Sequence, residues 1–250
     1  MSRRLCLGLA AASTRAVLTA LRSRPPGGPD RWRRENHAGR TVDLYAGPAV
    51  TAGAVLAAGR AHPGAGVAVL AAGACGAYDD VAGAGDPRRE FSVHLAALRE
   101  GEVTTGAVKL FGISAAGLVA GALLKERTVD KVLAGVVIAG AAHFVNLVDV
   151  RPGTAAGTVI ALGAPGMVRG GVAGDVAASV VGASVAVLPG DLGERTMIGD
   201  SGAHALGAAL GTAVAIGNGR LGLLAHAGAL VAAAAYGERI SEVARSLKPR

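Results

Sequence analysis

Three segments, far apart in the chain, put carboxylates at the edges of long apolar stretches. GAYDD places Asp79 and Asp80 after a long run of mostly Ala, Gly and Val, HFVNLVDVRPG places Asn146 three residues before Asp149, and ERTMIGDSGAHALG contains Asp200. Carboxylates at the ends of apolar helices cost desolvation free energy unless a cation pairs with them. Mg²⁺ suits such groups, because it takes oxygen ligands from one or two carboxylates together with phosphate oxygens. The residue types therefore indicate a magnesium and phosphate site, provided that the three segments meet.

The chain that must position these side chains is strongly apolar. Of its 250 residues, 51% are hydrophobic but only 3% are aromatic, and the mean hydropathy is +0.44. Long blocks dominated by Ala and Gly are typical of membrane helices that pack through small residues. The net charge of +7 comes largely from Arg clustered between these blocks without interleaved aromatic residues, which argues against nucleic-acid binding. Cys6 and Cys75 have neither metal-ligand nor disulfide spacing and are interpreted as small buried hydrophobic residues.

Nine apolar blocks are candidates for membrane-spanning helices, for which about 17 to 20 residues are needed, and several of these blocks are short. The predicted spans are residues 5–21, 46–60, 63–78, 106–124, 130–148, 154–169, 172–189, 198–217 and 220–237. The fold class is therefore predicted to be all-α, a polytopic integral membrane protein in which residues 1–250 form a single transmembrane domain. The basic start of the chain is also typical of a signal peptide. No small-residue cleavage site follows it and Arg15 interrupts the apolar run, so the first helix is expected to be kept.

The charges between the spans predict the orientation. Alternating spans divide the connecting segments into two sets, one with 15 Lys and Arg residues and the other with eight. The richer set includes the basic loops 22–45 and 79–105 and the tail 238–250. By the positive-inside rule this set is cytoplasmic and the N-terminus lies outside. The Arg run at residues 30–40 is interpreted as part of this topology signal, which also meets anionic lipid head groups.

All three acidic segments fall on the predicted cytoplasmic side. One Asp at a helix end is explained by helix termination alone, whereas three clusters at one surface are better explained by a shared ligand. Low Lys and high Arg, Ala and Gly content indicates a GC-rich bacterial genome. The expected location is therefore the bacterial inner membrane, with the site facing the cytoplasm.

In this order, the motifs resemble those of the polyprenyl-phosphate N-acetylhexosamine-1-phosphate transferases. That superfamily includes the phospho-N-acetylmuramoyl-pentapeptide transferase of peptidoglycan synthesis and the GlcNAc-1-phosphate transferases of polymer synthesis. The chain has the family's DD motif in GAYDDVAG, its NxxD motif in NLVDVRPG and its GDxGxxxxG motif in MIGDSGAHALG, and Lys109 in VKLFGI matches a family lysine. The chain departs from the family in three ways. DVRPG stands where the family usually has DG-x-DG-L, and the family's His-rich loop near the C-terminus is absent. The chain is also predicted to have nine helices, whereas the family usually has ten or eleven.

The resemblance implies an enzyme, a Mg²⁺-dependent phosphoglycosyl transferase of cell-wall or surface-polymer synthesis. Such an enzyme moves a sugar-1-phosphate from a UDP-sugar to a polyprenyl phosphate and releases UMP. The implied catalytic residues are Asp79, Asp80 and Asp200. Of these, Asp80 and Asp200 would hold the Mg²⁺.

The substrate-binding residues implied by the resemblance are Lys109, Asn146 and Asp149. Lys109 would offset phosphate charge as a point cation, Asn146 would hydrogen-bond phosphate or nucleotide, and Asp149 would support it. Expected partners are the polyprenyl phosphate, the UDP-sugar and membrane lipids, with no nucleic acid. Because members of the family are often dimeric, the resemblance also implies a homodimer. The neighbouring His143 and His204 are interpreted as structural, although contact with the site stays open for both.

Two other functions stay open. A degenerate homologue would keep the fold and lipid-phosphate binding without catalysis, and the incomplete middle motif and missing His-rich loop favour it. A transporter or channel would need acidic residues at mid-membrane depth. The acids here lie at the ends of the predicted helices, which disfavours that function.

Overall fold

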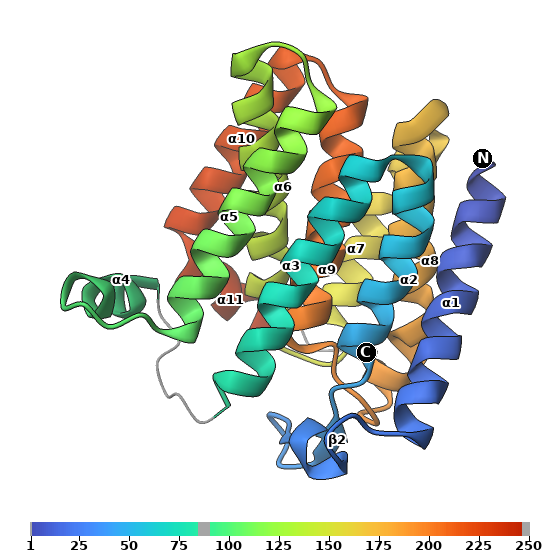
Figure 1. Ribbon diagram of the computed structural model, residues 1–250, viewed down its shortest axis with the longest axis vertical. Helices are drawn as coiled ribbons and strands as arrows, with labels where there is room; N and C mark the ends of the chain where they lie inside the picture. Colours follow the sequence, from blue (N-terminus) through green and yellow to red (C-terminus); the bar gives the residue numbers. More distant parts are fainter. Residues whose placement is uncertain (1, 85–90, 247–250) are drawn as a thin grey trace.

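The structure is a computed structural model that describes residues 2–84 and 91–246. Its α-helices are α1 (Arg3–Ser23), α2 (Ala46–Ala61), α3 (Pro63–Ala82), α4 (Phe91–Arg99), α5 (Thr105–Leu124), α6 (Thr128–Leu147), α7 (Thr154–Gly163), α8 (Gly171–Leu192), α9 (Gly199–Gly217), α10 (Arg220–Ala235) and α11 (Gly237–Ser246). Two 3₁₀ helices, η1 (Pro29–Trp32) and η2 (Pro165–Val168), and two antiparallel strands, β1 (Arg33–Glu35) and β2 (Thr41–Asp43), complete the described elements. Figure 1 shows the long helices packed side by side in one bundle.

The prediction of an all-α protein is confirmed, apart from the short hairpin. Each of the nine predicted blocks coincides with a helix, and the block 154–169 corresponds to α7 followed by η2. In the described part of the chain, five helices are long and apolar enough to cross a membrane, namely α1, α3, α5, α6 and α8. Helices α10 and α11 would add a sixth if they are one span, but the chain bends by 81° between them. Membrane character is therefore supported, whereas the nine crossings and their orientation stay predictions.

Helix starts are fixed by local capping. The Thr104 hydroxyl accepts a hydrogen bond from the Ala107 N–H at 3.1 Å, which satisfies one of the free donors at the start of α5. At the junction of α2 and α3, the His62 imidazole accepts the Gly64 N–H at 3.1 Å, and Pro63 occupies the first position of α3. Proline is favoured there because its missing N–H would have no partner in the helix. The apolar chain is thus divided into antiparallel helices by a few polar or ring-constrained residues.

Helix α9 lies at the centre of the bundle and packs against α2, α3, α6 and α8. Most of its side chains are buried, and small residues let its backbone approach its neighbours closely. A Cβ atom added at Gly207 would lie 2.4 Å from the carbonyl oxygen of Ala141 and 2.6 Å from the Cα of Ala142, both in α6. Leu206 and Val145 belong to the apolar core around this contact. The motif glycine therefore has a packing reason that is independent of any ligand.

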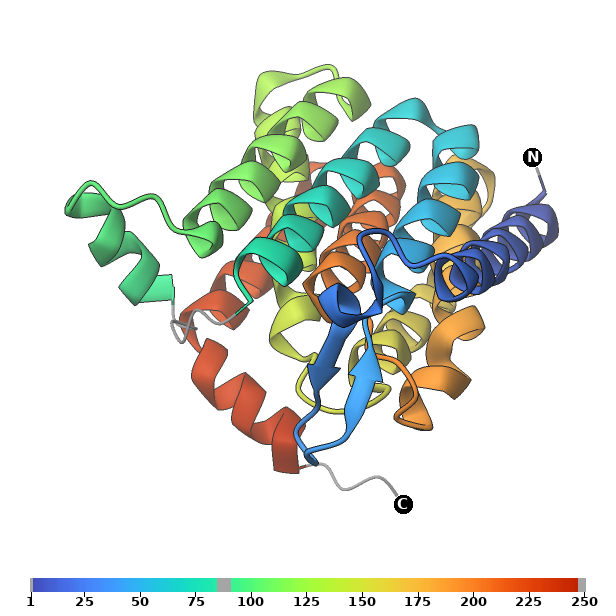
Figure 2. The same cartoon turned by 60° about the horizontal axis from the view of Figure 1, so that its bottom comes forward.

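The helices end at two opposite sides of the bundle, and one of these sides carries additional elements. One end, here named the hairpin end, contains β1, β2 and α11, and Figure 2 brings it forward. The Met197 N–H donates to the Asp43 carbonyl at 2.8 Å, which ties the segment before α9 to β2. The Ser241 hydroxyl donates to the Leu147 carbonyl at 2.9 Å, which ties α11 to the end of α6. The hairpin end therefore collects the carboxyl ends of α3, α6 and α8 and the amino ends of α5, α7 and α9.

The close crossing of α6 and α9 gives a stability prediction. Replacing Gly207 with Ala should lower the free energy of unfolding by about 1–3 kcal/mol, because the new methyl group meets main-chain atoms that cannot move aside easily. The matched control is Gly228→Ala in α10, where an added Cβ meets nothing within 4 Å. Thermal unfolding in detergent should show a lower Tm for the first variant alone. Equal Tm values for the two variants would contradict the packing role.

Candidate functional site

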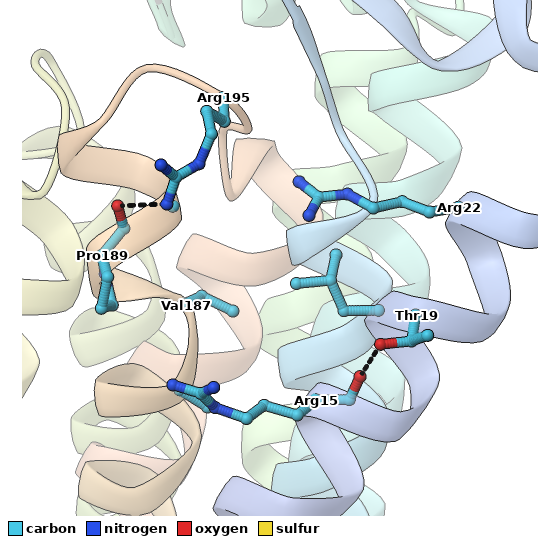
Figure 3. Close-up of a pocket in the computed structure, with 9 residues that line it drawn as sticks. Arg15, Thr19, Arg22, Val187, Pro189 and Arg195 are labelled. Carbon is cyan, nitrogen blue, oxygen red and sulfur yellow. Dashed lines mark hydrogen bonds between the residues drawn. The ribbon is translucent and has the colours of Figure 1, made fainter.

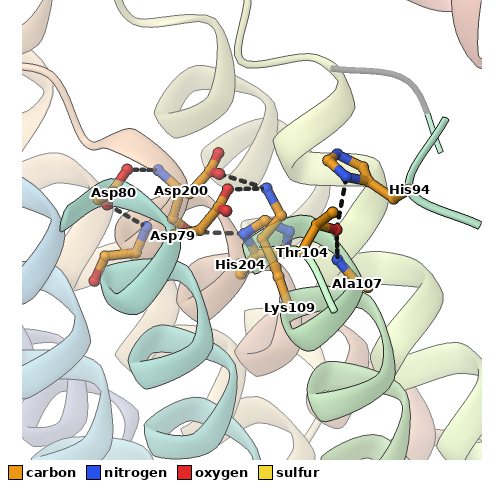
Figure 4. A network of polar contacts seen from close by, with 9 residues as sticks. Asp79, Asp80, His94, Thr104, Ala107, Lys109, Asp200 and His204 are labelled. Atoms are coloured by element: carbon orange, nitrogen blue, oxygen red, sulfur yellow. Dashed lines mark hydrogen bonds and ion pairs between the residues drawn. The ribbon is translucent and has the colours of Figure 1, made fainter. Parts of the chain in front are cut away.

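One lysine joins the first and last acidic segments. The Lys109 ammonium, near the start of α5, lies 2.6 Å from Oδ2 of Asp79 at the end of α3 and 2.5 Å from Oδ2 of Asp200 at the start of α9 (Figure 4). The three side chains are 18%, 16% and 25% exposed, so water screens their charges less than at an open surface. The contacts therefore hold the ends of three helices together.

The carboxylate of Asp80 caps α9 from outside that helix. Its Oδ1 accepts the Asp200 N–H at 3.0 Å and its Oδ2 accepts the Ser201 N–H at 2.9 Å. These donors belong to the first turn of α9, where N–H groups lack partners within the helix and the helix dipole favours a negative charge. Gly199 adopts a left-handed φ of 55°, and an added Cβ would lie 3.0 Å from both Asp80 oxygens. Glycine is therefore needed at this turn for both its conformation and its size.

An arginine that the sequence analysis treated only as a topology signal reaches the same place. The Arg34 guanidinium, from β1, donates to the main-chain carbonyl of Asp80. Its other nitrogen donates to the carbonyls of Arg33 at 2.7 Å and Arg31 at 3.1 Å, which fixes the guanidinium beside the end of α3. The hairpin thus adds a positive charge next to the two aspartates of the DD motif. Nothing in the local sequence distinguished Arg34 from the other arginines of this run.

Two histidines lie beside Asp200, between α6 and α9. The Nδ1 of His204 is 2.7 Å from the Asp200 carbonyl oxygen, and because a carbonyl only accepts, this nitrogen carries the hydrogen. The His143 ring packs edge-on against His204, with centroids 5.5 Å apart and planes at 84°. The Nε2 atoms of both rings are buried and have no hydrogen-bond partner among the described residues. His204 therefore supports the backbone of Asp200, which agrees with its structural interpretation.

The middle acidic segment lies at the hairpin end beside this cluster. The Asp149 N–H donates to the Asn146 carbonyl at 3.2 Å as α6 ends. Burial of the Asp149 side chain, together with the charges of Asp191, Asp200 and Asp80, raises the pKa of its carboxyl group well above the usual value. Asp149 is therefore near enough to the other acids for their charges to interact.

The loop that follows Asp149 is held by an acid that the sequence analysis did not select. The Asp191 carboxylate, at the end of α8, accepts the Gly153 N–H at 2.9 Å. Gly153 has a φ of 76°, a left-handed conformation that suits glycine, and it begins α7. Asp191 is only 3% exposed. No short motif surrounds this residue, so only the three-dimensional contact reveals its role in shaping the loop.

The acidic side chains suit Mg²⁺ that is shared with phosphate. Among the described residues, no group of three or more His, Cys, Asp or Glu side chains is arranged to hold a metal ion by itself. Mg²⁺ commonly needs only one or two carboxylates, because substrate phosphates and water supply its other ligands. Asp79 and Asp200 offer such carboxylates beside Lys109. The metal role of Asp80 stays a prediction, and both of its oxygens already accept main-chain hydrogen bonds.

The ion pairs of Lys109 give a second stability prediction. Lys109→Gln should lower the free energy of unfolding by about 1–3 kcal/mol, between the values for exposed and fully buried pairs, since two carboxylates lose their shared cation. Arg220→Gln is the control, because it breaks an exposed pair with Asp130 at the other end of the bundle. Denaturation in detergent should show a clearly smaller loss for Arg220→Gln. The bridging role is wrong if the two losses are equal.

The raised pKa of Asp149 predicts a pH dependence of stability. In the unfolded chain this carboxyl group releases its proton near pH 4, about the ordinary Asp value, whereas in the folded protein it keeps the proton to higher pH. Its contribution to stability therefore falls as the pH rises above about 4. Asp149→Asn, which mimics the neutral acid, should show a smaller fall in Tm between pH 4 and neutral pH. Parallel Tm profiles for the variant and the wild type would contradict the shift.

Comparison with known proteins does not assign a function, so the function is inferred from the geometry of the site. No family model matches the chain, and no curated protein matches it. The resemblance in the motifs therefore remains an expectation, and the functional conclusion depends on the arrangement of Lys109 and the carboxylates around it.

Proposed function

We propose that the protein is a membrane-embedded, Mg²⁺-dependent phosphoglycosyl transferase that moves a sugar-1-phosphate from a UDP-sugar to a polyprenyl phosphate and releases UMP. The observation that carries the proposal is the contact of Lys109 with both Asp79 and Asp200. This contact joins the segments of the DD and GDxG motifs at one end of an apolar bundle. Separate motifs of a shared active site are expected to meet in this way, whereas unrelated helix terminators are not.

The reaction needs groups that handle negative charge at a membrane surface. An oxygen of the lipid phosphate forms a bond to the sugar-linked phosphorus, while the bond from that phosphorus to the oxygen of the departing UMP breaks. Asp79 accepts the proton of the lipid phosphate, and the Lys109 ammonium stabilises the phosphate charge. Asp80 holds the first turn of α9 and thereby orients Asp200. When bound by Asp200 and phosphate oxygens, Mg²⁺ supplies further charge neutralisation.

The nucleotide side of the substrate is assigned to the neighbouring polar groups. Arg34 supplies a fixed guanidinium, which matches phosphate oxygens in geometry and charge. Asn146 can hydrogen-bond phosphate or base, and Asp149, which follows it at the end of α6, supports it. Nine membrane spans, an outer N-terminus and a cytoplasmic site in the bacterial inner membrane complete the proposal. The many arginines of the hairpin end support that orientation.

A second candidate is a non-catalytic homologue that binds lipid phosphate. The observation that favours it is the same lysine, because the Lys109 ammonium already neutralises part of the charge that a metal ion would otherwise balance. In this case the ion pairs would only maintain the fold. Turnover by the purified protein separates the two candidates directly.

The activity prediction concerns Asp200. Purified protein in detergent, supplied with undecaprenyl phosphate, Mg²⁺ and a panel of UDP-sugars, should release UMP with at least one of the sugars. Asp200→Asn should slow release by about a hundredfold or more, since a metal contact supplies several kcal/mol in the transition state. The matched control is Asp130→Asn, which removes a carboxylate at the opposite end of the bundle and should leave the rate unchanged.

The possible results distinguish the candidates. UMP release that chelation of Mg²⁺ abolishes supports the transferase. Full activity of Asp200→Asn rejects the role of that residue. A folded wild-type protein that releases no UMP from any of the UDP-sugars rejects the transferase in favour of the non-catalytic homologue.

A further inference from the structure

A polar recess, separate from the Lys109 cluster, lies at the hairpin end between α1 and α8. It is a cavity of about 310 Å³, and three arginines line it, Arg15 and Arg22 of α1 and Arg195 in the segment after α8. Figure 3 shows the Arg15 and Arg22 side chains extending from α1 towards α8, with Arg195 on the α8 side. None of these residues belongs to the Lys109 cluster, so the recess is a separate feature.

The recess has a surplus of positive charge. Among the residues that the structure describes, no acidic one lines it. Arg22 pairs with Asp43 of β2, with 3.0 Å between Nη2 and Oδ2, so one of the three guanidiniums has an acidic partner beside the recess. Arg195 donates to the carbonyl of Pro189 at 3.1 Å, which holds its guanidinium over the end of α8. An anion in the recess would therefore meet two further guanidiniums, those of Arg15 and Arg195, of which the second is held by its hydrogen bond to Pro189.

The position of Arg15 is costly in a membrane. It lies inside the apolar helix α1, which continues to Ser23 and qualifies as a membrane span by length and hydropathy. A charged side chain there needs an anion, water or access to the interface. Its long stem can carry the guanidinium towards the surface. Arg15 and Arg22 are seven residues apart, about 10 Å along the helix axis, so both guanidiniums can reach one head group near the surface.

The rest of the lining combines the polar side chain of Thr19 with apolar side chains. Leu18 of α1 and Val187 and Pro189 of α8 line it together with the arginines. A ligand with a phosphate group next to a hydrocarbon chain would satisfy both kinds of wall. A guanidinium suits phosphate because its N–H groups match two phosphate oxygens at once.

We propose that this recess binds the phosphate group of a membrane phospholipid, independently of the Lys109 site. The shared chemistry is a phosphate ester, which a soluble phosphate could also offer, but the place of Arg15 within an apolar span favours a lipid. A bound head group would join α1 to α8. It would also lie beside Arg22, whose pairing with Asp43 holds the β-hairpin.

The experiment measures stabilisation by two phosphate probes. Full-length protein in detergent is heated with mixed micelles of phosphatidylglycerol, or separately with inorganic phosphate. The wild type should show a rise in Tm with phosphatidylglycerol, and the double variant Arg15→Gln with Arg195→Gln should lose most of this rise. Arg24→Gln with Arg99→Gln is the control, since it removes the same charge from exposed residues that do not line the recess.

Each outcome supports or overturns the phosphate site, or shows whether its ligand is a lipid or a soluble phosphate. A rise with inorganic phosphate alone, lost in the double variant, supports the phosphate site and assigns it to a soluble ligand. Equal responses of the double variant and the control overturn the proposal. If the double variant does not fold, native mass spectrometry of Arg15→Gln replaces it. Fewer retained phospholipids than in the wild type then support the site, and equal numbers overturn it.

Discussion

The organisation of the hairpin end depends on one ammonium group shared by two carboxylates. Lys109, Asp79 and Asp200 come from three helices. Each of the three side chains is mostly removed from water, so an unpaired charge there would cost free energy. Small residues make the meeting possible, because a Cβ added at Gly76 would lie 2.3 Å from the main-chain oxygen of Asp200. The cap that Asp80 provides is a second link between α3 and α9. The packing of the bundle and the chemistry of its acidic end are therefore determined by the same contacts.

Much of the helical fold could be predicted because long apolar blocks have few structural alternatives. The predicted third span stops at residue 78, yet α3 continues to Ala82. Asp79 and Asp80 lie in its last turn, where Lys109 of α5 and the Ser201 N–H of α9 donate to their carboxylates. The β-hairpin, α4 and α11 were not predicted. All three are short, and the hairpin and α11 are also polar. Contacts with distant residues fix the hairpin and α11, as the hydrogen bond from the Met197 N–H to the Asp43 carbonyl illustrates. Such contacts leave no periodic pattern in the sequence.

The candidate site could be predicted in composition but not in its contacts. The order and placement of the motifs selected Asp79, Asp80, Lys109 and Asp200, and the structure brings all four together. The capping role of Asp80 and the approach of Arg34 depend on how α3, α9 and the hairpin pack, which spacing along the chain does not encode. Asp191 went unnoticed because one carboxylate near a helix end has no signature of its own. The proposed transfer reaction still depends on the resemblance of the motifs, whereas the ion pairs of Lys109 are seen directly in the structure.

The sharp turn between α10 and α11 has a consequence for how the protein sits in a bilayer. Helix α11 carries Ile240 on one side and Glu238, Glu242 and Arg245 in exposed positions, a division suited to the boundary between head groups and hydrocarbon. Because the Ser241 hydroxyl donates to the Leu147 carbonyl, α11 is tied to the end of α6, next to Asn146 and Asp149. In a bilayer, a change in hydrocarbon thickness that displaced α11 would therefore displace the end of α6 with it.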